Sequence, residues 1–234
     1  MKTKLIPTLM LLALGLFSLT AHALPKAFSA TYAVSKSGLS LGEMRLDLSY
    51  NQQNYYYKKS SKARGLAKLL SGDKMVENVQ GRFQGNYLQP QSYLFHHTSK
   101  RKNRKDQIQF TSPQQAVGQY KKDAFKLTIP KGTLDRASLE LALARDVSAN
   151  KAQLSYKVVE RGKIKTYHIK KAGNELLNHN GKQYHVQKMI VSHANKKRST
   201  VFWLAKELDY MPIRIDHTEK DKTIVTQLKR FKFK

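Results

Sequence analysis

The stretch MRLDLSY, residues 44–50, places a large apolar or aromatic side chain at every second position and a polar one between. The apolar and aromatic positions are Met44, Leu46, Leu48 and Tyr50. Successive side chains of a β-strand point to opposite faces of the sheet, so this period of two predicts a strand with one buried face.

Segments rich in β-forming residues recur along the rest of the chain, between turn signals such as Ser37-Gly38, Arg161-Gly162 and Asn180-Gly181. Asn-Gly is the favoured composition of a two-residue hairpin turn. Further turns are predicted at Gly85-Asn86, Ser112-Pro113 and Asn195-Lys196. Together with 44–50, the predicted strands are 28–34, 55–60, 74–83, 91–98, 106–111, 116–120, 125–129, 154–160, 163–170, 182–192, 199–204, 213–218 and 223–233.

Helical character is confined to two places. Residues 134–147 are nearly all strong helix formers, and Thr133 is the expected N-cap. Residues 65–70 fit a second short helix or turn. Since no linker or repeat divides the chain, we expect an all-β, mainly antiparallel single domain over residues 24–234, with one or two short helices.

The N-terminus resembles a cleaved secretory signal. Lys2 and Lys4 precede an apolar run from Leu5 to Leu19, and Ala21-His22-Ala23 fits a cleavage site. We expect residues 1–23 to be removed and a soluble mature chain, without a transmembrane segment, to reach the periplasm. The run is shorter than the roughly 20 residues of a membrane helix. The chain has no cysteine, which excludes disulfides and thiolate metal sites.

Positive charge dominates the composition, with 43 Lys and Arg against 16 Asp and Glu. Such a surplus attracts anionic partners over long distances. In an envelope these are anionic lipid, lipopolysaccharide or polysaccharide, and nucleic acid is not expected. A need for solubility explains the charge equally well, because the basic residues are dispersed along the chain. The densest run is predicted to be a hairpin loop that carries Lys100, Arg101, Lys102, Arg104 and Lys105.

Catalytic and metal-binding patterns are weak. His96 and His97 would point to opposite faces of a strand and could not share a metal ion. Gly38 to Gly42 matches G-x-S-x-G, but an alternating strand follows where a nucleophile elbow needs a helix. Ser40 is therefore expected to be a turn residue. We expect no metal, no cofactor and no enzymatic activity.

Residues 198–216, RSTVFWLAKELDYMPIRID, resemble the signature of the exported bacterial family called domain of unknown function 3108. Looser similarities are Tyr32 with 38–43, 65–70, Gly81-Arg82-Phe83 and 133–139. The resemblance implies a curved antiparallel sheet or incomplete barrel in the periplasm, and it brings no catalytic residues.

The residues of this signature are expected to be architectural. They are Trp203, Leu204, Tyr210, Pro212 and Arg214. Phe202 and Leu204 share one face of a strand, Trp203 points to the other, and Pro212 opens the next strand. A tryptophan here is expected to anchor the core, because an indole in a strand is more often core than ligand platform.

Two functions remain open from the sequence. One is a non-enzymatic periplasmic binding or accessory protein of the cell envelope, whose concave sheet holds an amphiphile, a lipid or an anionic glycan under a helical lid. The other is a structural or assembly partner that docks on another envelope component without a small ligand. The sequence by itself indicates no particular ligand-binding residue.

Overall fold

The computed structural model describes residues 24–84, 87–192 and 198–234. These residues form fourteen strands, two α-helices and a 3-10 turn. The strands are β1 Phe28–Lys36, β2 Leu39–Asn51, β3 Asn54–Ala63, β4 Lys74–Gln84, β5 Tyr87–Ser99, β6 Lys102–Ser112, β7 Gln115–Tyr120, β8 Asp123–Thr128, β9 Leu154–Glu160, β10 Lys163–His179, β11 Lys182–Ser192, β12 Arg198–Ala205, β13 Met211–Glu219 and β14 Lys222–Phe233. The helices are α1 Gly65–Leu70 and α2 Arg136–Ser148, and η1 is Lys206–Leu208. All fourteen predicted strands are present.

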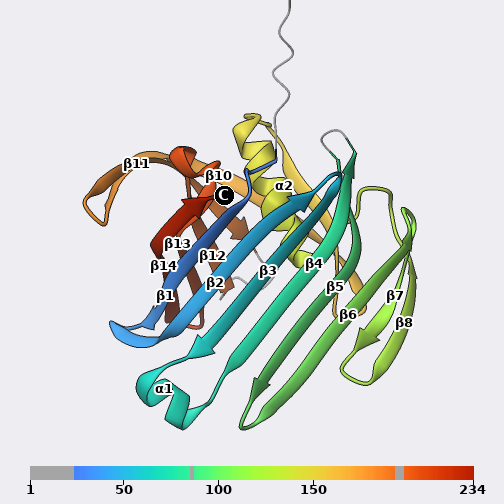
Figure 1. Ribbon diagram of the computed structural model, residues 1–234, viewed down its shortest axis with the longest axis horizontal. Helices are drawn as coiled ribbons and strands as arrows, with labels where there is room; N and C mark the ends of the chain where they lie inside the picture. The colour runs from blue at the N-terminus through green and yellow to red at the C-terminus, as the bar shows by residue number, and fades with distance from the viewer. Residues whose placement is uncertain (1–23, 85–86, 193–197) are drawn as a thin grey trace, which may run out of the picture.

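The strands form one antiparallel sheet in the order β8-β7-β6-β5-β4-β3-β2-β1-β14-β13-β12-β11-β10-β9. Pairing of β1 with β14 joins the two ends of the described chain in the middle of the sheet. Within the described residues β8 and β9 do not pair with each other, so the sheet curls around α2 without closing (Figure 1). The predicted all-β, curved antiparallel fold is confirmed.

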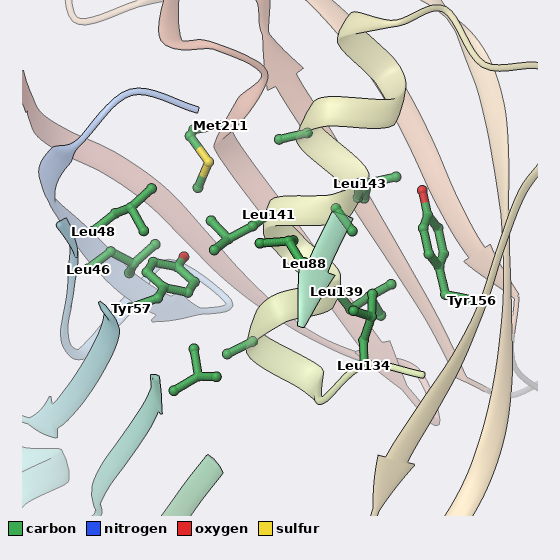
Figure 2. Packing of buried hydrophobic residues seen from close by; sticks show 14 of the residues in the cluster. Leu46, Leu48, Tyr57, Leu88, Leu134, Leu139, Leu141, Leu143, Tyr156 and Met211 are labelled. Atoms are coloured by element: carbon green, nitrogen blue, oxygen red, sulfur yellow. The ribbon is translucent and has the colours of Figure 1, made fainter. Parts of the chain in front are cut away.

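Helix α2 connects the two outer strands, β8 and β9, and lies inside the curl. Its buried residues come from every side of the helix, because both walls of the sheet contact it. Figure 2 shows its leucines between Leu46, Leu48 and Tyr57 on one side and Tyr156 on the other. The expectation of a helical lid over an open concave face is therefore wrong, since the helix fills the part of the interior where it lies.

The start of α2 differs from the prediction by two residues. Asp135 is the N-cap, and its carboxylate accepts hydrogen bonds from the backbone N–H groups of Ala137 and Ser138 at 2.8 and 2.9 Å. Thr133 donates its hydroxyl hydrogen to the Pro130 carbonyl instead. Leu134 pairs with Val158 of β9, which holds the preceding segment extended. The helix can begin only after that pairing ends.

Four fully buried tyrosines form much of the core, and each hydroxyl has a partner. Tyr32 donates to the Pro212 carbonyl at 2.8 Å. Tyr55 hydrogen-bonds Ser138 at 2.8 Å, Tyr57 donates to Glu140 at 3.1 Å and Tyr93 donates to Glu77 at 2.6 Å. Unpaired buried hydroxyls are destabilising, so these bonds select particular partners across the curl.

Three of the predicted two-residue turns are confirmed, whereas the turn predicted at Ser112-Pro113 lies one residue later, at Pro113-Gln114, because pairing with Gln115 keeps Ser112 in β6. Both residues of Ser37-Gly38, Arg161-Gly162 and Asn180-Gly181 have positive φ angles, as hairpin turns that match the strand twist require. The predicted turns at 85–86 and 195–196 and the predicted signal segment 1–23 lie outside the described residues.

The prediction that Ser40 is a turn residue is wrong. Ser40 lies in β2, opposite Ser35 of β1, and is not a turn residue. Neither α1 nor α2 is long and apolar enough to cross a membrane.

Candidate binding cleft

A cleft opens where neighbouring strands β5 and β6 separate. Their ladder runs only from Ser99 opposite Lys102 to Ser92 opposite Gln109. Beyond that point β5 stays paired with β4, and β6 stays paired with β7. The two hairpins therefore diverge and leave a cleft of about 720 Å³ between their ends.

Two β-bulges explain the separation. Gln91 has no partner in the ladder between β4 and β5, where the register shifts, and Thr111 has none between β6 and β7. An extra residue bends the strand that carries it, so a bulge in each strand turns the two ends apart. Pro90, beside the first bulge, also lacks the N–H that a ladder would use.

The cleft combines an apolar lining with positive charge. Leu88, Pro90, Phe110 and Pro113 are its apolar contributors. Arg82 and Lys131 also line it, and none of its described lining residues is acidic. A volume within the range of about 300–1,000 Å³ is typical of small-molecule sites. The arrangement suits a ligand with an apolar body and an anionic group.

The segment 131–133 forms another part of the lining and leads directly into α2. Gly132 has a φ of +81°, a conformation that favours glycine. Thr133 is fixed by two contacts to Pro130, at 2.6 Å through its hydroxyl and 3.2 Å through its N–H. This part of the cleft is thus positioned by the capped start of the buried helix.

A hydrogen-bonded chain connects the neighbourhood of the cleft to the helix cap. Gly81 lies opposite the lining residue Pro90, and a Cβ at Gly81 would stand 2.5 Å from the Tyr55 hydroxyl oxygen. Tyr55 bonds Ser138, and Ser138 donates to Asp135 at 2.6 Å. Burial raises the pKa of Asp135 to about 6, against the opposing effect of the hydrogen bonds from Ser138 and Ala137.

A buried charge cluster holds α2 against the sheet. Lys59 of β3 pairs with Glu77 of β4 at 3.1 Å and also contacts Glu140 of α2. Burial tends to raise the pKa of Glu77, but the charges of Lys59 and Arg136 and the hydrogen bond from Tyr93 lower it to about 2. The partners satisfy one another, which is the behaviour of a structural cluster rather than of a group poised for proton transfer.

Arg136, the first residue of α2, links the two walls of the curl. Its guanidinium carbon lies 5.6 Å from the centre of the Phe95 ring of β5. Its Nε lies 3.8 Å from a carboxylate oxygen of Glu160 in β9. Glu160 also accepts from Lys165 at 2.5 Å and Tyr167 at 2.6 Å. These contacts further favour a structural role for the charges near α2.

The basic run predicted to be a hairpin loop is mostly strand. Lys100 and Arg101 form the turn, whereas Lys102, Arg104 and Lys105 belong to β6. Arg104 is half-buried, with its guanidinium 5.2 Å from the centre of the Phe95 ring. The prediction placed too many residues in the loop because hydrogen bonding to β5 extends the ladder to Lys102 despite the charge.

The signature residues form the corner from β12 through η1 to β13. Leu204 and Pro212 are buried opposite each other, and Asp209 and Tyr210 turn the chain with positive φ angles. Arg214 makes two 2.8 Å contacts with Asp216. The architectural role of these residues remains a prediction.

Trp203 is only half-buried, in contrast to the expected core anchor. Its neighbours in the sheet are Lys188 and Arg214, whose charged groups lie 5.3 and 5.0 Å from its ring centre. Its indole N–H donates to Glu175. Charged cross-strand neighbours keep this face of the sheet in contact with water, so the indole packs against the core only in part.

His96 and His97 have different partners, Asn103 and Asp73, as the alternation of strand side chains predicts. In the parts of the chain that the structure describes, no cluster of three or more His, Asp or Glu could hold a metal ion. The cleft residues Phe110 and Lys131 were not identified from sequence. The only signal near the cleft was the similarity at Gly81-Arg82-Phe83 and 133–139, which contributes Arg82 and Thr133.

Residues 27–229 match the model of the family described as "Protein of unknown function (DUF3108)", and the chain belongs to this family. The chain is also similar to a solved beta-barrel-like protein of domain of unknown function DUF1849 from Brucella abortus. The sequence identity is 9%, the TM-score is 0.62, and the match covers 91% of this chain and 100% of that chain. This likeness concerns the fold alone. No curated protein matches.

Proposed function

We propose that this member of the DUF3108 family is a non-enzymatic binding protein of the cell envelope that holds an amphiphile with an anionic head group. The observation that carries the proposal is the cleft between β5 and β6. Its apolar residues suit a hydrocarbon chain, and Arg82 and Lys131 suit an anionic head. The signal-like segment 1–23 supports action in the periplasm.

A filled cleft should not bind such a ligand. Ser112 is exposed and lines the cleft, so Ser112→Trp should occupy the space without disturbing the core. Binding of dodecyl phosphate, followed by calorimetry below its micelle concentration, should fall at least tenfold. Gln114→Trp is the matched control, because Gln114 is exposed and close to Ser112 but does not line the cleft. Equal binding by both variants would place the ligand elsewhere.

The head group can be tested separately from the chain. Arg82→Gln with Lys131→Gln should weaken the binding of dodecyl phosphate by at least tenfold, since each charged hydrogen bond contributes about 1.5–3 kcal/mol. Dodecyl maltoside, which has the same chain and no charge, should bind both forms alike. An equal loss of affinity for both detergents would contradict recognition of the anionic head group.

A second candidate function, docking on another envelope component, is favoured by α1. Leu69 and Leu70 are 69% and 71% exposed, and Leu39 beside the β1–β2 turn is 72% exposed. The N–H of Arg64 donates to the Leu41 carbonyl, and Lys100 donates to the Leu69 carbonyl. These bonds and Figure 1 place α1 at the same edge as the turns of β1–β2 and β5–β6. Exposed leucines among basic residues fit an anionic membrane surface.

For this candidate, Leu69→Gln with Leu70→Gln should abolish sedimentation with vesicles of phosphatidylglycerol at about 0.15 M salt, where charge attraction is screened beyond about 8 Å. The wild-type protein should sediment. Leu39→Gln should have a smaller effect of the same sign. Identical sedimentation of wild type and the double variant would exclude the leucines as the anchor.

A further inference from the structure

A second hollow lies on other elements than the cleft and differs from it in charge. Its volume is about 690 Å³, and it is formed by β1, β2, β14 and the turn between β10 and β11. Five cationic residues line this basic groove, and none of its described lining residues is acidic. They are Arg45, Lys182, Lys229, Arg230 and Lys232. They come from three separate stretches of the sequence.

The sheet register brings two of these charges into one row. Thr31 of β1 pairs with Arg45 of β2 on one side and with Arg230 of β14 on the other. Paired residues of neighbouring strands project to the same face, so both arginines flank Thr31. Lys232 follows in the next row, opposite Ser29. Like charges gathered on one face repel one another unless an anion lies between them.

A β-bulge in β14 contributes to the groove. Thr31 faces Arg230 and Tyr32 faces Leu228, so Lys229 has no partner in this ladder. The Leu228 carbonyl beside the bulge is contacted from the β10–β11 turn. The buried His179 contacts that oxygen through Nε2, and the Asn180 amide donates to the Leu228 and Lys229 carbonyls at 3.3 and 3.4 Å.

These bonds fix the β10–β11 turn onto β14. The turn therefore brings Lys182 to the groove from a strand that does not pair with β14. The cations then stand on two sides of one hollow. Such an arrangement is defined by tertiary contacts and does not follow from a general surplus of lysine.

Most of these cations have no carboxylate partner. Among the described residues, the only ion pair of the five is the one between Lys229 and Glu43, at 3.3 Å. The nearby Asp47 is paired with Lys234 at 2.8 Å. Arg45, Lys182, Arg230 and Lys232 form no ion pair with a described carboxylate and can contact an external anion, in contrast to Lys59 and Lys165, which are paired internally. Arg45 also lies near Glu43, since its charge contributes to lowering the pKa of that carboxyl, after the larger effect of Lys229.

We propose that the basic groove binds a saccharide that carries two or more phosphate groups. Cations on two sides of the hollow match two separated phosphates, which arginine recognises through paired hydrogen bonds. Ser29, Thr31 and Asn180 offer neutral hydrogen-bonding groups for hydroxyls, and Tyr184 offers an aromatic ring for the sugar. The volume exceeds the need of a single phosphate. The site is independent of the cleft.

Calorimetry with glucose 1,6-bisphosphate tests the proposal at about 0.15 M salt, where long-range attraction is screened. The wild-type protein should bind this sugar bisphosphate. A triple variant that combines Arg45→Gln, Lys182→Gln and Arg230→Gln should bind it at least tenfold more weakly. The matched control changes the same number of charges at exposed positions outside the groove, Arg101→Gln with Lys102→Gln and Lys122→Gln, and should bind like wild type. Thermal melts should show that all three proteins fold.

Several results would overturn the proposal. An equal loss of binding in both triple variants would show that net charge alone, rather than the basic groove, accounts for the affinity. Equal binding of inorganic phosphate would contradict recognition of a saccharide, and so would equal binding of unphosphorylated glucose. If the triple variant did not fold, Arg45→Gln alone would serve, with an expected loss of about threefold against Arg101→Gln. Ser112→Trp, which tests the cleft, should leave this binding unchanged, so the two sites can fail separately.

Discussion

The charged residues of this protein are of two kinds, buried ones that pair with other residues of the chain and exposed ones that can contact a ligand. Lys59 is largely enclosed beside α2, where it pairs with the buried Glu77 and with the half-buried Glu140. Arg45 and Arg230 are exposed and unpaired by any described carboxylate, although they lie in the same sheet. Burial decides the difference, because a charge removed from water requires a partner.

Glu77→Gln should destabilise the protein at neutral pH by about 3–5 kcal/mol, because Lys59 would lose its 3.1 Å partner in a buried site. The folded-state pKa of Glu77, about 2, lies below its ordinary value of 4.5. Its stabilisation is therefore present above about pH 4.5 and is lost as the pH falls toward 2. Urea denaturation at pH 7 and pH 3 should show the difference from wild type shrinking in acid.

The matched control for Glu77 is Glu219→Gln, which removes an exposed partner of Arg198. Exposed pairs contribute about 0–1 kcal/mol, so this variant should stay close to wild type. If Glu77→Gln were equally mild, Lys59 would have to be satisfied by Glu140 alone, and the cluster would not be held together as described.

At the scale of elements, α2 and the bulged strands determine where sites can form. α2 fills the curl where it lies, and the cleft lies between the bulged ends of β5 and β6. The helix in turn depends on its cap at Asp135, which the pairing of Leu134 with β9 fixes in place.

Asp135→Ala should destabilise the protein by about 1–2 kcal/mol through loss of the cap, and by more if Ser138 and Tyr55 are left unpaired. Asp135→Asn, which keeps an acceptor, should cost much less. The pKa of Asp135 is raised to about 6 in the folded state from 3.8. The folded protein therefore keeps this proton longer than the unfolded chain, and stability should fall as the pH rises from about 4 to 6.

Asn at this position removes that titration. Relative to Asp135→Asn, the wild type should lose stability between pH 4 and pH 6 and then remain constant, as measured by urea denaturation across this range. A wild type that gained stability over this range relative to the Asn variant would indicate a lowered pKa and would contradict the dominant effect of burial.

At the scale of the whole molecule, two candidate sites lie on one curled sheet, and export of the protein is a prediction from its first 23 residues. We expect the mature chain to start at Leu24, because Ala21-His22-Ala23 fits signal cleavage. N-terminal sequencing of protein from the periplasmic fraction should give Leu-Pro-Lys, and Ala23→Asp should leave the precursor uncleaved. A mature protein that retained Met1 would contradict export through this segment.

Local sequence patterns determined the strands and most turns of this protein. Alternation of side chains and residues that tolerate positive φ act over a few positions, so 44–50 and Asn180-Gly181 could be interpreted without the rest of the chain. The same locality explains the errors. The basic run beyond Lys102 joins a strand because β5 offers it a partner, and Trp203 is half-buried because of its neighbours Lys188 and Arg214.

Only the tertiary structure decided where the interior is filled and where it is open. The sequence marks no bulge at Gln91 or Thr111, and these bulges separate β5 from β6. Likewise, Arg45, Lys182 and Arg230 are far apart in the sequence and meet because β1 pairs with β14 and His179 fastens a distant turn to it. Strand register and long-range hydrogen bonds bring such distant residues together. Both depend on which segments pair with each other, and the composition of a single segment does not determine this.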